Sequence, residues 1–184
     1  MTEPVELTTR RLVLSVPAAA DIDAIFAACQ DPDIQRFTTV PSPYQRADAE
    51  RFVRLAAEWW DTGEEYTWAI RAGGALVGMI GLHGIRAGAA EIGYWLAAPA
   101  RGRGYLNEAA EAVLDLAFGP MRLQRVEWRA VTDNPASARV AQRLGFRYEG
   151  LLRLGLGGIG GSRRDGHIAG LLATDPRTPQ AWPL

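Results

Sequence analysis

Residues 101–107 read Arg-Gly-Arg-Gly-Tyr-Leu-Asn, and the segments on either side of them decide the fold. A strand-like run precedes them at residues 91–97. A helical pattern opens at about Asn107, because small and apolar residues then recur at the spacing of one buried helical stripe. The stripe consists of Leu106, Ala109, Ala110, Val113, Leu114 and Ala117. Gly119-Pro120 ends the helix, since glycine can adopt a left-handed cap and proline cannot continue the helix.

The two glycines at the start of this helix suit a phosphate group. Because Gly102 and Gly104 lack side chains, a ligand can approach the first backbone N–H groups of the helix, which have no partner inside it. The helix dipole adds partial positive charge there, and Arg101 and Arg103 add full charges. A strand, a glycine-rich turn and a helix occur in many nucleotide sites, so this pattern alone predicts a phosphate cradle and no particular ligand.

Composition limits the class of protein. A chain of 184 residues and 20.0 kDa is expected to form one domain. The formal net charge of −1 predicts no general attraction to nucleic acid or to an anionic membrane. The single cysteine, Cys29, excludes an intrachain disulfide and a cysteine-rich metal site, and we expect no metal. The sequence shows no signal-peptide pattern and no long apolar run, so we expect a cytoplasmic protein.

Hydrophobic periodicity predicts the remaining elements. Three further helices are expected, one beginning near Asp21, one over residues 46–60 and one beginning at Asn134. Strands are expected at residues 12–16, 66–71, 75–83, 123–131, 146–154 and about 165–172. Residues 37–43 are expected to form a loop, and residues 173–184 an irregular tail.

A series of short segments makes the interpretation specific. In chain order they are Thr9-Arg10-Arg11-Leu12-Val13-Leu14, Leu76-Val77-Gly78-Met79-Ile80-Gly81, Glu91-Ile92-Gly93-Tyr94-Trp95-Leu96, residues 101–108, Val126-Glu127, Asp133-Asn134-Pro135-Ala136-Ser137, Leu144-Gly145-Phe146, Glu149-Gly150 and Asp165. With these segments in this order, the chain resembles the GNAT superfamily of N-acetyltransferases, in particular the branch that includes ribosomal-protein N-terminal acetyltransferases. The resemblance covers roughly residues 9–172. It implies an α+β fold with α/β/α layers, in which a single domain over residues 1–184 holds a mixed, mostly antiparallel, twisted sheet of seven strands flanked by about four helices.

The resemblance implies acetyl-CoA as co-substrate. It places the pantetheine arm beside the backbone of Trp95, Leu96 and Ala97, as an extra strand. The diphosphate would lie on Arg101, Gly102, Arg103, Gly104, Tyr105, Leu106 and Asn107, held mainly by backbone groups. In the family motif Q/R-x-x-G-x-G/A, Arg101 and Gly104 match, whereas Leu106 departs from the small residue expected at the end.

Transfer of an acetyl group to an amine needs a base, because the acceptor must be neutral to attack. Along the strand at residues 91–97, alternation places Glu91, Gly93 and Trp95 on one side. Gly93 leaves a gap through which an amine can reach the Glu91 carboxylate, and some GNAT enzymes carry their general base at this point of the equivalent strand. The alternative is that Glu91 only makes a surface or cross-strand pair.

Asn134 and Ser137 fall at the start of the last predicted helix, where this branch has its Asn and Ser. The resemblance gives Asn134 a hydrogen bond with the pantetheine amides. Many GNAT enzymes place a tyrosine acid one turn further along, but this chain has Ala141 there. Ser137 is therefore the candidate that protonates or hydrogen-bonds the leaving sulfur. The alternative for Asn134 and Ser137 is helix capping.

Several aromatic and histidine side chains have two interpretations. Adjacent Trp59 and Trp60 point about 100° apart on a helix. Either one of them lies in the core while the other is partly exposed, or one of them covers the acceptor site together with Tyr44. His83 and His167 each lie in a predicted strand, and a structural role is favoured for both.

Residues 155–160 satisfy the dinucleotide fingerprint G-x-G-x-x-G literally. We reject this interpretation, because too little chain remains for the helix and the second strand that the fingerprint needs. Residues 155–161 are instead expected to form a flexible hairpin loop, because five of the seven are glycine. The resemblance implies that this loop borders the acceptor pocket. Asp165 is expected to pair with Arg163 or Arg164 rather than to contact an amine.

The predicted activity is direct transfer of acetyl from acetyl-CoA to a primary amine, at a peptide N-terminus or on a small molecule, without a covalent enzyme intermediate. Relatives that modify ribosomal proteins can carry a second acidic residue after Glu149-Gly150, but residues 151–158 have none, so their substrate and base are not transferred to this chain. The alternatives are another acyl donor such as succinyl-CoA, which Arg163-Arg164 would permit, and a non-catalytic acyl-CoA-binding regulatory domain. A homodimer is left open.

Overall fold

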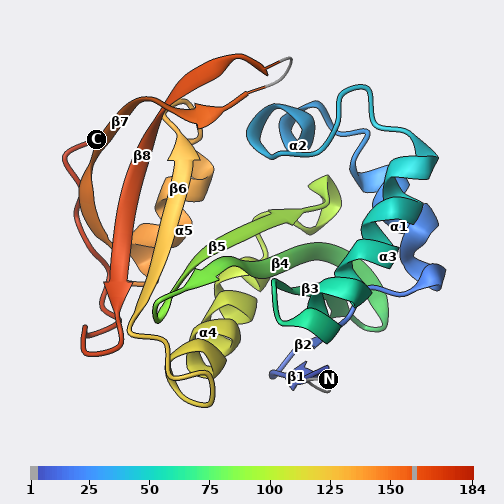
Figure 1. Cartoon of the computed structure of the whole chain (residues 1–184), viewed down its shortest axis with the longest axis horizontal. Coiled ribbons are helices and arrows are strands. Elements are labelled where there is room, and N and C mark those ends of the chain that lie inside the picture. The colour runs from blue at the N-terminus through green and yellow to red at the C-terminus, as the bar shows by residue number, and fades with distance from the viewer. Residues whose placement is uncertain (1–3, 159–160) are drawn as a thin grey trace.

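Eight strands in one twisted sheet form the centre of the computed structural model, which describes residues 4–158 and 161–184 (Figure 1). The strands are β1 (Leu7–Thr8), β2 (Leu12–Ser15), β3 (Tyr66–Ala72), β4 (Ala75–Arg86), β5 (Ala89–Leu96), β6 (Arg125–Val131), β7 (Arg147–Gly157) and β8 (Arg163–Leu172). The α-helices are α1 (Ile22–Ala28), α2 (Pro32–Phe37), α3 (Arg46–Thr62), α4 (Tyr105–Phe118) and α5 (Pro135–Arg143), and two short 3-10 helices, η1 (Ala19–Asp21) and η2 (Ala98–Ala100), connect other elements. The predicted α+β fold with a mixed, mostly antiparallel sheet is confirmed.

The described residues hold one strand and one α-helix more than predicted. The additional strand is β1, which has two residues and pairs antiparallel with β2. The additional helix is α2. Asp31-Pro32-Asp33 does end α1, but Asp31 then accepts a hydrogen bond from the Asp33 N–H at 2.7 Å and Pro32 takes the first helical position. The residues that end one helix therefore begin the next, and Phe37 lies in a helix rather than in the predicted loop.

The sheet has the strand order β1-β2-β3-β4-β5-β6-β8-β7, and only the β5–β6 pair is parallel. That pairing is short, because residues 89–91 of β5 lie opposite residues 125–127 of β6 and no further β5–β6 pair occurs in the described chain. Beyond this point β6 continues alongside β8 as far as Val131. Figure 1 shows the β5 and β6 ribbons diverging toward α2.

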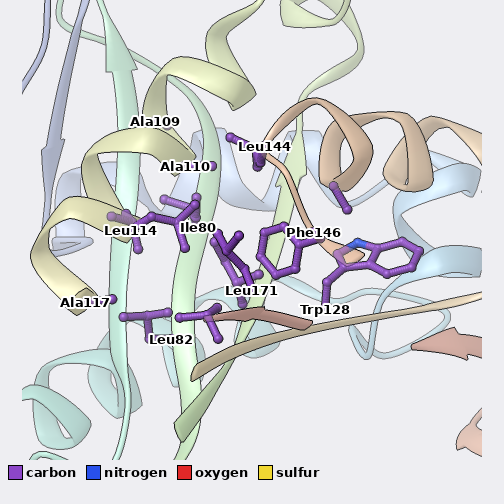
Figure 2. Packing of buried hydrophobic residues seen from close by; sticks show 14 of the residues in the cluster. Ile80, Leu82, Ala109, Ala110, Leu114, Ala117, Trp128, Leu144, Phe146 and Leu171 are labelled. Carbon is purple, nitrogen blue, oxygen red and sulfur yellow. The ribbon is translucent and has the colours of Figure 1, made fainter. Parts of the chain in front are cut away.

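Helices cover both faces of the sheet. The predicted stripe of α4 is buried except for Leu106, which is only partly buried, and its small side chains face Ile80 and Leu82 of β4 (Figure 2). Met79, the neighbour of Ile80, points to the opposite face and packs with residues of α1, α2 and α3. The predicted α/β/α layers follow from this alternation. Within the described part of the chain, no helix is long and apolar enough to cross a membrane.

The tryptophan pair of α3 divides between core and surface. Trp60 is 1% exposed, and its Nε1 donates to the Thr67 carbonyl at 2.9 Å. Its ring packs edge-on against Trp68, with 5.0 Å between ring centroids. Trp59 is only half-buried. The expectation that one tryptophan lies in the core and the other is partly exposed is confirmed.

The last residues, 173–184, contain no helix or strand, but a buried tryptophan, two ion pairs and backbone hydrogen bonds hold them to the domain. Trp182 is 8% exposed and donates from Nε1 to the Phe146 carbonyl at 2.9 Å. Its ring centroid lies 5.2 Å from that of Trp128 in β6. The tail therefore completes the core beside β6 and β7.

Asp21 is the one buried charged residue in the part of the chain that the structure describes, at 4% exposed. It precedes α1 as predicted, but its carboxylate caps no first-turn N–H of that helix. Instead, both oxygens accept hydrogen bonds from Arg71 at 2.7 Å, and Oδ2 also accepts the Ala18 N–H at 2.8 Å. Burial alone would raise the pKa of Asp21, but these hydrogen bonds outweigh it and the pKa lies below its ordinary value.

We predict that Asp21→Ala lowers the free energy of unfolding by about 3 kcal/mol at pH 7, because it leaves the Arg71 guanidinium half-buried and unpaired. The folded pKa is depressed, so the contribution of Asp21 is present above the unfolded value of about 3.9 and is lost as the pH falls through the folded value. Urea denaturation of wild type and variant between pH 7 and pH 3 measures both effects.

Asp23→Ala is the matched control, because the Asp23 side chain is 79% exposed and pairs with Arg46 at the surface. Its expected cost is below about 0.5 kcal/mol. Equal losses for the Asp21 and Asp23 variants would contradict a structural role for the buried pair.

Candidate active site

A cleft of about 970 Å³ opens where β5 and β6 diverge. Its wall includes most of the site residues that the sequence predicts: Glu91, Trp95, Leu96, Arg101, Gly102, Gly104, Leu106, Asn107, Asn134 and Ser137. Ala97, Arg103 and Tyr105 lie outside the wall. The Ala97 N–H donates to the Val77 carbonyl at 2.9 Å, and the Tyr105 ring lies under the guanidinium of Arg11. In the described residues no cluster of three or more His, Cys, Asp or Glu side chains is placed to hold a metal.

The glycine-rich turn before α4 has the backbone shape of a phosphate cradle. Gly102 and Gly104 both have φ of 76°, a left-handed conformation that favours glycine, and Gly104 is the N-cap of α4. A Cβ at Gly102 would meet no atom within 4 Å, so the space beside this turn is open. The first intrahelical hydrogen bond of α4 is donated by the Glu108 N–H, and the N–H groups before it have no intrahelical acceptor. The turn therefore fits an anionic group.

Arg101, predicted to lie at the diphosphate, already has partners within the chain. Its Nη2 lies 2.9 Å from Asp31 Oδ2, its Nη1 lies 3.5 Å from Asp33 Oδ2, and its Nε donates to the Leu96 carbonyl at 3.2 Å. The guanidinium is thus neutralised by the start of α2. Arg103 is exposed, and its carbonyl accepts a hydrogen bond from Arg11. Anion binding at this turn would rest mainly on backbone groups.

A second set of ion pairs ties α2 to the opposite side of the cleft, and we call it the Asp133 bridge. Asp133, between β6 and α5, pairs with Arg36 of α2 and with Arg164 of β8, whose Nη2 lies 2.5 Å from Asp133 Oδ1. Arg164 also donates to the Arg36 carbonyl at 3.0 Å. These contacts connect α2, the start of α5 and the β7–β8 hairpin above the diverging strands.

Ser137 lies in a hydrogen-bond network that spans the divergence of β5 and β6. Its Oγ accepts from Trp128 Nε1 at 3.0 Å and donates to the Tyr94 hydroxyl at 3.2 Å. Its N–H donates to Asn134 Oδ1 at 3.1 Å, so Asn134 caps α5 as the alternative interpretation proposed. The Tyr94 hydroxyl donates in turn to the Ser137 carbonyl at 3.3 Å.

The sequence reasoning missed Tyr94 and Trp128. Burial raises the pKa of Tyr94 to about 12, and the hydrogen bonds from Ser137 and Trp128 only partly oppose this rise. Tyr94 therefore stays protonated and acts as a neutral hydrogen-bond partner of Ser137. Ala141, where many family members carry a tyrosine, is fully buried. The alternation along β5 already placed Tyr94 on the face opposite Glu91, but it did not show that this face also borders the cleft.

Glu91 makes the cross-strand pair that the alternative interpretation proposed, and this pair lies in the cleft wall. Its Oε1 lies 3.5 Å from His83 Nε2, and its Oε2 lies 3.6 Å from Arg129 Nε. The gap expected at Gly93 is filled, because a Cβ at Gly93 would lie 2.7 Å from His83 Cε1. His83 lines the cleft together with Glu91 and Glu65. The structure thus corrects the idea that Gly93 provides an open path to Glu91.

The wall formed by α2 and α3 includes three aromatic side chains among aliphatic and charged ones. Phe37, Phe52 and Trp59 line it, with the Phe52 and Trp59 ring centroids 6.5 Å apart. Tyr44 also borders the cleft but is 4% exposed, so it belongs mostly to the core. Of the adjacent pair Trp59 and Trp60, only Trp59 lines the cleft, so it is the one that an acceptor molecule can contact.

Two predictions made for the last strands have different outcomes. His167 is hydrogen-bonded through Nδ1 to the Tyr148 hydroxyl at 3.1 Å and is not part of the cleft wall. Asp165 accepts a hydrogen bond from the Leu154 N–H at 2.6 Å, and within the described residues it forms no ion pair with Arg163 or Arg164. Residues 155–157 belong to β7, and residues 159–160 lie outside the described part of the chain.

Residues 11–147 match the family described as "Acetyltransferase (GNAT) domain". The chain belongs to the GNAT acetyltransferase family. The uncharacterised N-acetyltransferase YoaA of Bacillus subtilis is 29% identical over 151 residues, which cover 80% of this chain and 85% of YoaA. The putative ribosomal N-acetyltransferase YdaF of the same bacterium is 40% identical over 85 residues, which cover 45% of this chain and 46% of YdaF.

A solved structure shows the same architecture. RimL, a ribosomal L7/L12 alpha-N-protein acetyltransferase crystallised with coenzyme A, aligns with a TM-score of 0.83 and 19% identity. The alignment covers 92% of this GNAT chain and 98% of RimL. At this identity the likeness establishes the fold, a single GNAT-like domain. Membership of the family makes the chain an acyltransferase.

We predict that Gly102→Ala lowers the free energy of unfolding by about 1 kcal/mol, because an alanine at φ 76° is strained although its Cβ has open space. Gly157→Ala is the matched control, since its Cβ also meets nothing within 4 Å and its φ is not positive. We expect that control to be neutral or slightly stabilising. Urea denaturation measures both variants, and equal stability would contradict the left-handed turn.

Proposed function

We propose that this GNAT domain transfers an acetyl group directly from acetyl-CoA to a primary amine, at a peptide N-terminus or on a small molecule. The observation that carries the proposal is one continuous cleft with a glycine-rich helix start at one end and a carboxylate–imidazole pair at the other. A cytoplasmic location and a single catalytic domain spanning the chain are part of the proposal.

The free edge of β5 suits an extended amide-containing arm. Within the described chain β5 has no strand partner on the β6 side beyond Glu91, so its backbone groups there can pair with a ligand. Trp95 and Leu96 lie on this edge in the cleft wall. The turn at Gly102 and Gly104 follows directly and would hold a diphosphate. Bound acetyl-CoA supplies an activated thioester between these two contacts and the opposite end of the cleft.

The side chains of the cleft fit the two proton transfers that the reaction needs. On one side, Glu91 and His83 can receive a proton from the amine. On the other side, the Ser137 hydroxyl accepts from Trp128 and gives its one hydrogen to Tyr94 in the free protein. Rotation of this hydroxyl would redirect the hydrogen to the departing sulfur. The network thus supplies a hydrogen-bond donor in a chain that has Ala141 where many family members carry a tyrosine.

Direct transfer is favoured over a covalent acyl-enzyme. Cys29 is the only cysteine of the chain, and it is 1% exposed in the core beneath α1. Burial raises the pKa of its thiol to about 11, so little thiolate forms at neutral pH. No other side chain is needed as an acyl carrier if the amine attacks the thioester itself.

An acetyl group is favoured over an anionic acyl group such as succinyl. The sequence offered Arg163 and Arg164 as partners for a second carboxylate. In the structure Arg163 donates to the carbonyls of Leu154 and Gly155, and Arg164 pairs with Asp133. Both guanidinium groups are therefore already engaged.

We predict that the purified protein transfers labelled acetyl from acetyl-CoA to at least one amine in a panel. The panel contains peptides that begin with Ser, Ala or Met, and small aliphatic and aromatic amines. Free thiol release gives the rate, and mass spectrometry identifies the acetylated amine. Thermal stabilisation by coenzyme A without turnover on any amine would favour the binding-domain alternative. Faster release from succinyl-CoA than from acetyl-CoA would overturn the proposed donor.

We predict that Ser137→Ala lowers kcat on the order of 100-fold, because the donor to the departing sulfur is lost. The dissociation constant for coenzyme A should change less than about twofold, since the backbone contacts at the turn remain, and calorimetry measures it. Ser15→Ala on β2, outside the cleft, is the control and should leave kcat unchanged. A wild-type kcat in Ser137→Ala would remove Ser137 from the mechanism.

A further inference from the structure

We infer that His83 is the proton acceptor for the amine, and that Glu91 is a positioning residue for it. The inference rests on the proposed function, because it assigns the base within the same cleft. It begins with the finding that Glu91, the base candidate from the sequence, shares the cleft wall with an imidazole from the neighbouring strand.

A β-bulge brings His83 to this position. Arg86 pairs with Ala89 across the two-residue turn at 87–88. Regular pairing from there would place His83 opposite Ile92, which lies in the core. Gly84 has φ of 61° and lies where the register shifts, so that His83 is opposite Glu91 instead. Because opposite residues share a face of the sheet, His83 joins Glu91 on the cleft side.

Gly93 provides the space that the imidazole occupies. Any Cβ at Gly93 would lie 2.7 Å from His83 Cε1, so a larger residue would displace the ring. The His83 side chain is nevertheless 38% exposed, and its Nε2 lies 3.5 Å from Glu91 Oε1. The ring is held on one side and open to the cleft on the other, which is the arrangement that a proton acceptor needs.

Charged groups from three elements surround this imidazole: Glu65 before β3, Glu91 on β5 and Arg129 on β6. The hydrogen bond with Glu91 raises the pKa of His83 above its ordinary value, burial opposes the rise, Glu65 adds to it and Arg129 reduces it. Burial also raises the pKa of Glu65. Two carboxylates against one guanidinium favour the approach of a cationic amine.

The contacts of Glu91 suit an orienting role better than a basic one. One oxygen faces His83 and the other faces Arg129, so both are engaged. A carboxylate beside an imidazole commonly fixes its tautomer and stabilises its cation. An ordinary imidazole, with a pKa of about 6.5, is also more basic than an ordinary carboxylate of about 4.3. An amine cation, which ionises near pH 8 or above, therefore loses its proton more readily to His83.

The proton balance assigns one proton to His83. The acceptor arrives as R–NH3+ and leaves as an amide N–H, so its nitrogen loses two protons while the C–N bond forms and the thioester C–S bond breaks. His83, neutral at the start, takes the first proton and releases it to water. The second proton leaves with the sulfur as a thiol, on the side of the cleft where Ser137 lies.

The pH dependence of kcat at saturating amine tests the inference, with the best acceptor from the amine panel as the probe. The wild-type rate should rise with pH through the pKa of His83 and then level off, because transfer needs the neutral imidazole. We expect His83→Gln to remove this rise and to lower the plateau on the order of 100-fold. Glu91→Gln should move the rise to lower pH, because the negative charge beside the ring, which raises the pKa of His83, is lost.

Nuclear magnetic resonance gives a second readout that needs no substrate. The chain has two histidines, so comparison with His83→Gln assigns both imidazole signals. Glu91→Gln should lower the pKa of His83 in the free protein. His167→Gln is the matched control, because His167 is hydrogen-bonded to Tyr148 away from the cleft wall, and it should leave the pH profile of kcat unchanged.

Three results would overturn the inference. The first is a pH profile of kcat in His83→Gln that equals that of the wild type. The second is a pH profile in which Glu91→Gln loses the rise and His83→Gln keeps it. The third is an NMR titration of His83 that Glu91→Gln leaves unshifted. The first two leave the proposed function standing, because acetyl transfer is still observed. If the wild type transfers acetyl to no amine, the proposed function fails and this inference fails with it.

Discussion

The structure depends on the place where β5 and β6 stop pairing. Parallel strands satisfy each other's backbone groups, so their separation leaves polar groups that need other partners. In this chain Tyr94 of β5, Trp128 of β6 and Ser137 of α5 form a side-chain network across the divergence. The side-chain network holds the diverging strands together, while the backbone groups of β5 beyond Glu91 stay without a strand partner on the β6 side in the described chain. The turn before α4 and the His83 pair take their positions from these same strands.

Many arginines of this chain cross-link different elements. All basic residues except the two histidines are arginine, whose planar group forms paired hydrogen bonds with carboxylates. Arg71 joins β3 to the start of α1 through Asp21, and Arg101 joins the glycine-rich turn to the start of α2. The second link is the less expected one, because the sequence suggested Arg101 as a ligand for phosphate. A charge near a glycine-rich turn can thus link the turn to a neighbouring helix.

The sequence predicted what depends on local periodicity and motif order. The alanine-rich stripe of α4 and the alternation of β5 gave the core and the cleft face, and the order of the short segments gave the family. Local patterns were not sufficient where the outcome depends on contacts between distant elements or on one backbone angle. Asp31 both ends α1 and caps α2, which composition alone does not distinguish. The face on which His83 lies depends on a one-residue bulge at Gly84. Regular alternation from the turn at 87–88 would place His83 on the face opposite Glu91. Arg101 and Tyr94 found partners from α2 and α5 that no local pattern indicates.

The Asp133 bridge makes the upper part of the cleft sensitive to ionic strength. Its three side chains, Arg36, Asp133 and Arg164, are 58%, 38% and 29% exposed, so dissolved ions reach them. The screening length falls from about 8 Å in physiological salt to about 3 Å in 1 M salt. Concentrated electrolyte therefore loosens the connection between α2 and the β7–β8 hairpin, while the buried pair of Asp21 and Arg71 is screened far less. The salt concentration of the buffer thus acts on this side of the cleft even in the absence of a ligand.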